Sequence, residues 1–132
     1  MSQENVEIAR RSFEAINRWD IDAWLKHLAP DCEFDLSRAV GPVHGTYYGL
    51  DQIRQAVEEF HEPWESFRQE LDELIDAGES VVASVTGYFR GRDGMEVRAR
   101  AAFVWTIRDG AIAHICFYQE RQDALEAAGL LE

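Results

Sequence analysis

Three long runs of β-branched and aromatic residues fill the C-terminal half of the chain and constrain its fold more than any other feature. They cover residues 80–90, 95–107 and 111–120, and an Asp-Gly pair separates each run from the next. Asp-Gly is among the strongest signals for a tight β-hairpin turn. The sequence therefore predicts an antiparallel meander of three long strands.

The N-terminal half has the spacing of helices. Apolar residues recur at intervals of three and four over residues 6–16, 21–28 and 50–61, and Asp20 stands where it can cap the second helix. Residues 32–36 are typical of a short strand, 37–49 of a loop, and 123–129 of a short closing helix. Residues 66–76 fit a helix and a strand equally well, and periodicity does not decide between them.

Helices followed by an antiparallel sheet predict an α+β fold, and 132 residues is the length of a single domain, residues 1–132. Long strands with few helices indicate a strongly curved sheet, which forms a cone closed by the N-terminal helices. Such a cone leaves an internal apolar cavity in place of a solid core.

Charge and composition exclude several classes of partner. With 25 acidic and 13 basic residues, the formal net charge is −12. Because this surface repels phosphate backbones and anionic lipids, we expect neither a nucleic-acid nor a membrane partner. The first residues lack the basic-then-apolar order of a signal peptide, so we expect a cytoplasmic protein. The four histidines are scattered and there is no Cys-x-x-Cys motif, so we expect no metal and no cofactor.

The turn at Asp93-Gly94 predicts which strand residues share a face. With two residues in the turn, positions 84, 86 and 88 lie on the same face as positions 99, 101 and 103. That face combines hydroxyls, small alanines and an aromatic ring, which suits a small and mostly apolar organic ligand. The opposite face would carry the residues Val85, Phe89, Arg98, Arg100 and Val104. It is too apolar to be left wholly in water, so we expect a homodimer through this outer face.

The turn at Asp109-Gly110 leaves two registers open for the second hairpin. A two-residue turn directs His114, Cys116 and Tyr118 toward the cavity. A three-residue turn shifts the pairing by one position and directs Ile115, Phe117 and Gln119 there instead.

Asp35 is the one candidate catalytic residue. Simple alternation along residues 32–36 places Phe34 and Leu36 on the core side and Asp35 outside. A bulge near Leu36 would turn Asp35 inward, where burial would raise its pKa toward the range of a general base. Without the bulge, Asp35 is an ordinary ionised carboxylate beside Arg38 that contributes little.

Four segments carry a family resemblance: AINRWDIDAWLKHLAPDCEFD, YYGLDQIRQAV, VWTIRDGAIAHI and DALEAAGL. With the predicted order of helices and strands, they resemble the SnoaL-like branch of the nuclear transport factor 2-like (NTF2-like) superfamily. Ketosteroid isomerase and the SnoaL polyketide cyclase belong to that superfamily. The resemblance covers nearly the whole chain. It implies a cystatin-like cone, a strand over residues 66–76, and the second of the two registers at Asp109-Gly110.

The resemblance implies less about activity, because this fold carries many functions. Ketosteroid isomerase-like members use an aspartate base, a tyrosine and a second acid. The matching positions here are Leu36, Ser12 and Phe103, and Asp35 precedes the base position by one residue. The resemblance therefore implies a small-molecule-binding domain whose activity is unassigned. The alternative is an isomerase or cyclase that acts on an apolar polycyclic or terpenoid substrate with Asp35 as general base. The residues expected to contact the ligand are Ser12, Ile16, Trp24, Leu36, Tyr48, Ser84, Thr86, Tyr88, Ala101, Phe103, Phe117 and Gln119.

Overall fold

A computed structural model describes residues 2–39 and 43–130, so that residues 40–42 of the predicted loop lie outside the described residues. The helices are α1 (Ser2–Asn17), α2 (Ile21–Leu25), α3 (Gly49–His61) and α4 (Arg121–Ala127). The strands are β1 (Leu28–Leu36), β2 (Gly45–Tyr48), β3 (Trp64–Asp76), β4 (Ser80–Gly91), β5 (Glu96–Arg108) and β6 (Ala111–Tyr118).

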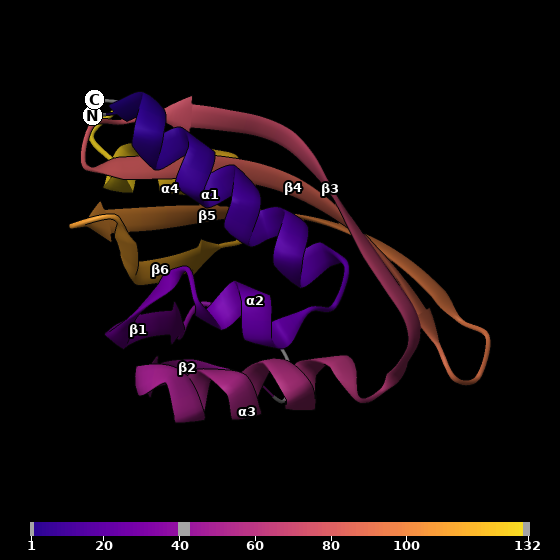
Figure 1. The fold of residues 1–132 in the computed structure, drawn as a ribbon. Helices are drawn as coiled ribbons and strands as arrows, with labels where there is room; N and C mark the ends of the chain where they lie inside the picture. The colour runs from indigo at the N-terminus through magenta and orange to yellow at the C-terminus, as the bar shows by residue number, and fades with distance from the viewer. Residues whose placement is uncertain (1, 40–42, 131–132) are drawn as a thin grey trace.

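The strands form one sheet in the order β2-β1-β6-β5-β4-β3. All neighbouring strands are antiparallel except β1 and β6, which run parallel. Figure 1 shows the long strands β3, β4 and β5 bending, with α1 lying across them and α3 beside β1 and β2. We call the face that α1 covers the concave face, and the opposite face, which α4 covers in part, the outer face. The predicted α+β fold, a curved sheet closed by N-terminal helices, is confirmed.

The turn that ends α1 has an unusual backbone. Trp19 has a φ of 59°, in the left-handed region that glycine usually occupies. The N–H of Asp20 donates to the carbonyl of Ala15 at 2.9 Å, the bond of a Schellman cap. The Trp19 indole stacks on His61, with ring centroids 3.8 Å apart. Asp20 then caps α2 as expected, because its side chain accepts from the N–H of Ala23 at 3.1 Å.

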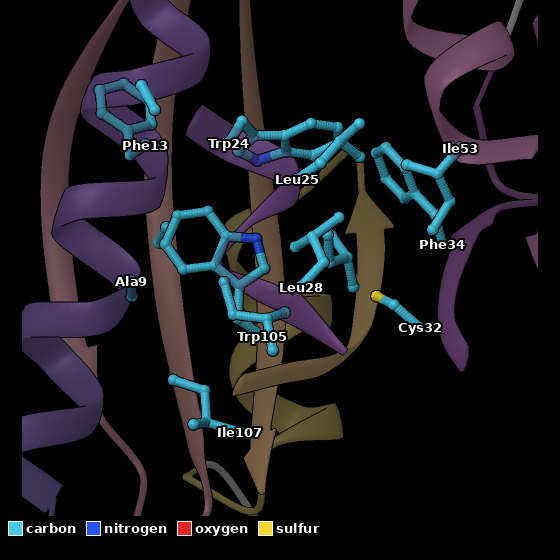
Figure 2. Packing of buried hydrophobic residues seen from close by; sticks show 14 of the residues in the cluster. Ala9, Phe13, Trp24, Leu25, Leu28, Cys32, Phe34, Ile53, Trp105 and Ile107 are labelled. Atoms are coloured by element: carbon cyan, nitrogen blue, oxygen red, sulfur yellow. The ribbon is translucent and has the colours of Figure 1, made fainter. Parts of the chain in front are cut away.

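The main core lies between the helices and the concave face. Its buried members include Ala9 and Phe13 of α1, Trp24 of α2, and Trp105 of β5. Figure 2 shows Trp24 beside Leu25 and Trp105 facing α1. These side chains come from the helical spacing and strand alternation that the sequence displays, so the core follows directly from the pattern.

The first hairpin has a different register from the predicted one. Thr86 pairs with Arg100, and the N–H of Gly91 donates to the carbonyl of Met95 at 2.7 Å. The turn therefore holds three residues, 92–94, and Gly94 has a φ of 89°, the left-handed residue that such a loop needs. The predicted two-residue turn is wrong.

A slip of one residue moves every side chain of a strand to the other face. The β5 residues Ala101 and Phe103 stay on the concave face as predicted, but the β4 residues exchange sides. Their concave positions are Val81, Ala83, Val85, Gly87 and Phe89. Ser84, Thr86 and Tyr88 therefore lie on the outer face. This correction removes these three residues from the predicted ligand contacts.

The second hairpin directs the side chains that the resemblance implies to the concave face, since Trp105 pairs with Ile115 and Phe103 with Phe117. Its turn nevertheless has two residues, because Asp109 and Gly110 both have left-handed φ values of 52° and 79°. An extra residue at Ala113 then shifts the pairing by one position. Bulge and turn together direct Ile115 and Phe117 to the concave face, as a three-residue turn would also have done, although that turn would have paired Trp105 with Ala113.

The outer face is less apolar than predicted. Val85 and Phe89 lie on the concave side, and Val104 packs with Val82 beneath Ala124 and Leu125 of α4. The arginines at positions 98 and 100 are exposed on the outer face, as expected. The apolar surface on which the dimer prediction rested is therefore absent from the described residues.

Two strands differ in extent from the sequence-based expectation, and a third confirms it. β1 begins at Leu28 instead of residue 32, and β2 forms where a loop was expected. Both depend on partners far along the chain, which local periodicity does not reveal. β3 confirms the strand that the resemblance implied over residues 66–76.

Within the described part of the chain, no helix is both long and apolar enough to cross a membrane.

Candidate functional site

A group of half-buried apolar side chains lies on the concave face, and we call it the concave apolar site. It consists of Ile16, Leu36, Ala101, Phe103 and Phe117. Phe103 contacts the ring of Phe117 edge to face, with centroids 5.6 Å apart. Leu36 and Phe117 each follow a member of the β1–β6 pair Asp35–Cys116, so they lie on neighbouring strands and on one face. All five residues are predicted from the sequence. The sheet brings four of them together, and Ile16 lies on α1, which covers this face.

The concave positions of four of the strands carry no charge. From β1, β4, β5 and β6 they hold aliphatic and aromatic side chains, glycine, alanine and the Cys32 thiol, but no acidic or basic group. Burial, followed by the charges of Asp31 and Glu33, raises the pKa of Cys32 to about 12, so this thiol stays protonated. The site therefore offers apolar surface without a general base on these strands.

Two further predicted contacts lie on the inner side of the helices but belong to the packed core. Ser12 is buried, and its hydroxyl donates to the carbonyl of Ala9 at 2.9 Å. Trp24 is also buried and meets the Phe34 ring edge to face, with centroids 6.3 Å apart (Figure 2). Both side chains are already satisfied by the protein, so a ligand would reach them only if the core opened.

The remaining predicted contacts lie away from the concave apolar site. Thr86 donates to Asp72 Oδ2 at 2.6 Å on the outer face, and the Tyr88 hydroxyl donates to Glu70 at 3.1 Å there. Tyr48 is 59% exposed and pairs with Glu33, an outer-face residue of β1.

Ser84 completes this set, because it pairs with Ala102 on the outer face. Gln119 differs from these residues. It is exposed just beyond β6, and its amide donates to the backbone carbonyl of Arg100 at 3.0 Å, next to Ala101 of the site.

Asp35 points away from the concave apolar site. It pairs with Cys116 on the face opposite Phe34, and its side chain is 20% exposed. The carboxylate accepts hydrogen bonds from the Ser37 N–H at 2.9 Å and from the Thr46 hydroxyl at 3.4 Å. The Cys116 thiol donates to it at 3.6 Å. Asp35 thus holds the residues after β1 against β2 and β6.

The ionisation of Asp35 also differs from that of a buried base. Burial by itself raises its pKa, but the hydrogen bonds from Ser37 and the charge of Arg38, 3.4 Å away, outweigh burial and lower the pKa overall. The Arg38 guanidinium is held in place over the ring of Tyr118, 4.8 Å from its centroid. An acid with a lowered pKa stays ionised at neutral pH, and the Asp35 carboxylate lies on the outer face.

Sequence reasoning missed Gly87 and Phe89 of β4, which lie on the concave face together with the correctly placed Ala99. A signal was present. Along residues 80–90 the odd positions are apolar or glycine, whereas the even ones carry mostly hydroxyls and a charge. Strand alternation thus favoured the observed faces, while the Asp-Gly rule favoured the other register.

Surface hollows and metal ligands add little to this site. One hollow of about 530 Å³ lies at the tip of β3, β4 and β5, where most of its lining residues, among them Arg68, Tyr88 and Arg98, belong to the outer face. Another of about 390 Å³ lies between β2 and α3. Over residues 2–39 and 43–130, no three His, Cys, Asp or Glu side chains are grouped so that they could hold a metal ion.

Known proteins share this architecture. An NTF2-like protein from Burkholderia thailandensis E264 is 28% identical over 94% of this chain and 95% of its own, with a TM-score of 0.79. TerC, co-crystallised with polyporic acid, is 21% identical over 96% and 98% of the two chains, with a TM-score of 0.79. A candidate polyketide cyclase from Xanthomonas campestris pv. campestris is 24% identical over 96% and 98%, with a TM-score of 0.71.

No curated protein matches the chain. The sequence model of the SnoaL-like domain, in contrast, matches residues 9–115, which is most of its length. Together with the fold, this match shows that the chain belongs to the SnoaL-like domain family of the NTF2-like superfamily.

Proposed function

We propose that the concave apolar site binds a small, mostly apolar and uncharged organic molecule. The observation that carries this proposal is the set of half-buried apolar side chains on the concave face, where β1, β4, β5 and β6 carry no acidic or basic residue. Apolar surface left partly open among packed elements is the usual setting of a small-molecule site. The co-crystal of TerC with polyporic acid supports the small-molecule part of the proposal, since that protein has the same fold.

A paired substitution on β5 tests this site. Ala101 and Arg100 are neighbours whose side chains point to opposite faces. Ala101→Trp fills the concave apolar site, so we expect it to abolish the binding of any hit from a thermal-shift screen of neutral metabolites. Arg100→Trp is the matched control, and it should keep the binding. Retained binding in Ala101→Trp would place the ligand elsewhere and refute the proposal.

The alternative function is an isomerase or cyclase that uses Asp35 as general base, and the candidate polyketide cyclase with this fold gives it some support. The position and lowered pKa of Asp35 argue against it. With a turned-over substrate in hand, Asp35→Asn decides between the two functions. A loss of turnover of about 100-fold or more, as expected for a general base, would favour the enzyme.

The homodimer stays a prediction, now on electrostatic grounds. The outer face carries both signs of charge, as in the Arg68–Glu70 ion pair of 2.7 Å and the nearby Arg98. A two-fold interface needs such a self-complementary patch. Sedimentation at micromolar concentration should show a species of twice 15.1 kDa, and Arg98→Glu should reduce the fraction of protein in that species. A single 15.1 kDa species would refute it. The cytoplasmic location also stays a prediction.

A further inference from the structure

In the described part of the chain, one edge of β5 is left without a neighbouring strand over half of its length. β6 ends at Tyr118, which pairs with Ala102, so residues 96–101 of β5 pair with β4 alone. Figure 1 shows the tip of β4 and β5 extending past the end of β6. Residues 92–98 are all exposed, and so is Arg100. An uncovered row of backbone groups is a ready template for a further strand.

The hydrogen bonds of the β4–β5 hairpin show which backbone groups lie on that edge. The N–H of Gly91 donates to the carbonyl of Met95, so the odd-numbered residues of β5 direct their N–H and C=O groups toward β4. The even-numbered residues, among them Arg98 and Arg100, direct theirs toward the open edge. There the carbonyl of Arg100 accepts the side-chain amide of Gln119 at 3.0 Å, in the place of a strand N–H.

The side chains along this edge differ between the two faces of the sheet. Arg98 and Arg100 project from the outer face. Neither guanidinium forms an ion pair within the residues that the structure describes, although the chain has 25 acidic and only 13 basic residues. On the concave face, the same stretch carries Val97 and Ala99. A strand added here would therefore lie beside apolar side chains on one face and beside two unpaired cations on the other.

The charges on this edge disfavour a second copy of the chain as the added strand. An antiparallel two-fold pairing over residues 96–100 would set Arg98 directly opposite its own counterpart. Like charges directly opposite each other destabilise a strand pair. Carboxylates beside Arg98 and Arg100 would instead form charge-assisted contacts with both guanidinium groups.

We propose that residues 96–101 of β5 form a strand-addition edge, which binds an extended acidic segment of a different protein. The segment lies antiparallel to β5 and in line with β6. Its backbone pairs with the open edge, its acidic side chains lie beside Arg98 and Arg100, and the apolar residues between them lie beside Val97 and Ala99. This inference goes beyond the proposed function and does not depend on it.

A synthetic peptide, acetyl-Glu-Val-Glu-Val-Thr-amide, tests the strand-addition edge. Its glutamates match Arg100 and Arg98, and its threonine matches Glu96. NMR titration of the isotope-labelled protein reports affinity and position together, and we expect shifts centred on residues 96–101. With excess peptide, the N–H of Arg98 should exchange with solvent about tenfold more slowly, because it is then hydrogen-bonded. A net charge of −12 repels an acidic peptide, so general charge attraction would not explain binding.

Two modified peptides separate strand pairing from the attraction of charges. N-methylation of the central glutamate removes the N–H that faces the carbonyl of Arg98, so we expect the affinity to fall by about fivefold or more. N-methylation of the first valine is the matched control. It removes an N–H that faces away from β5, so the affinity should change by less than about twofold.

Two variants test the charges. Arg100→Glu replaces attraction by repulsion, so we expect binding to weaken by about fivefold or more. Arg108→Glu makes the same change of charge at an exposed position at the far end of β5, so its effect should stay below about twofold. Melting curves check that both variants fold, and the peptide comparison on the wild type decides the question if one of them does not.

Several results would overturn the strand-addition edge. These are the absence of shifts at residues 96–101 with millimolar peptide, equal affinity of the two N-methylated peptides, and equal binding by folded Arg100→Glu and Arg108→Glu. An N–H of Arg98 that is protected without peptide, and loses its protection on dilution, would show that a second copy occupies the edge instead. None of these results bears on the concave apolar site, whose test is the loss of ligand in Ala101→Trp.

Discussion

Replacing Asp35 by asparagine is expected to destabilise the fold by about 1–2 kcal/mol at pH 7, although the sequence alone predicts almost no effect. The short bond from the Ser37 N–H to the carboxylate is charge-assisted, and a neutral acceptor keeps about half of its value. The ion pair with Arg38, whose side chain is half exposed, adds less than about 1 kcal/mol. For 132 residues, the unfolding entropy is about 0.3 kcal/mol/K, so the Tm should fall by about 4–7 °C.

The effect should depend on pH in one direction. The folded-state pKa of Asp35 is lowered, so its stabilising contribution is fully present above the unfolded pKa of about 3.9. The contribution is lost as the pH falls through the folded-state value, because the folded protein must then protonate this carboxylate. The gap in stability between the wild type and Asp35→Asn should therefore close below about pH 4.

Urea unfolding between pH 3 and pH 7, followed by circular dichroism, measures this gap directly. Asp31→Asn is the matched control, because Asp31 lies exposed on the same strand and its replacement should change stability by less than about 0.5 kcal/mol. Equal stability of Asp35→Asn and wild type at pH 7 would refute the reasoning. So would a gap that persists unchanged down to pH 3.

Three further outcomes follow from single contacts. Trp19→Gly should be more stable than Trp19→Ala by about 1 kcal/mol in thermal melts. Both variants lose the stack on His61, but only alanine keeps the strain of a left-handed backbone. The reverse order of stability would contradict the claim that the backbone is strained at position 19. The Cys32 thiol, whose pKa burial raises to about 12, should resist a chromogenic disulfide reagent at pH 8 until urea unfolds the protein, and rapid labelling of the native state would contradict this. Thr86→Val should cost about 1–2 kcal/mol through the lost bond to Asp72 yet leave ligand binding unchanged, and a loss of binding would return Thr86 to the site.

Several parts of this protein follow from the sequence alone. The helical spacing in α1 and α3 and the three β-rich runs need only the period of each element. Alternation along residues 32–36 correctly separates Phe34 and Leu36 from Asp35. Each of these features is local, because the residues that decide it are neighbours in the chain.

Only the tertiary structure decided the rest. Turns of two and three residues at positions 92–94 both accept Asp-Gly, so packing of the concave face selects between them. Asp35 contacts Cys116, which is 81 residues away in the sequence and lies on the parallel neighbour of β1. No local pattern predicts that these two strands pair. The same register places Phe89 over Gly87. The local sequence predicts which residues of a strand share a face. Contacts between distant segments decide the pairing register, and a shift of that register by one residue exchanges the two faces.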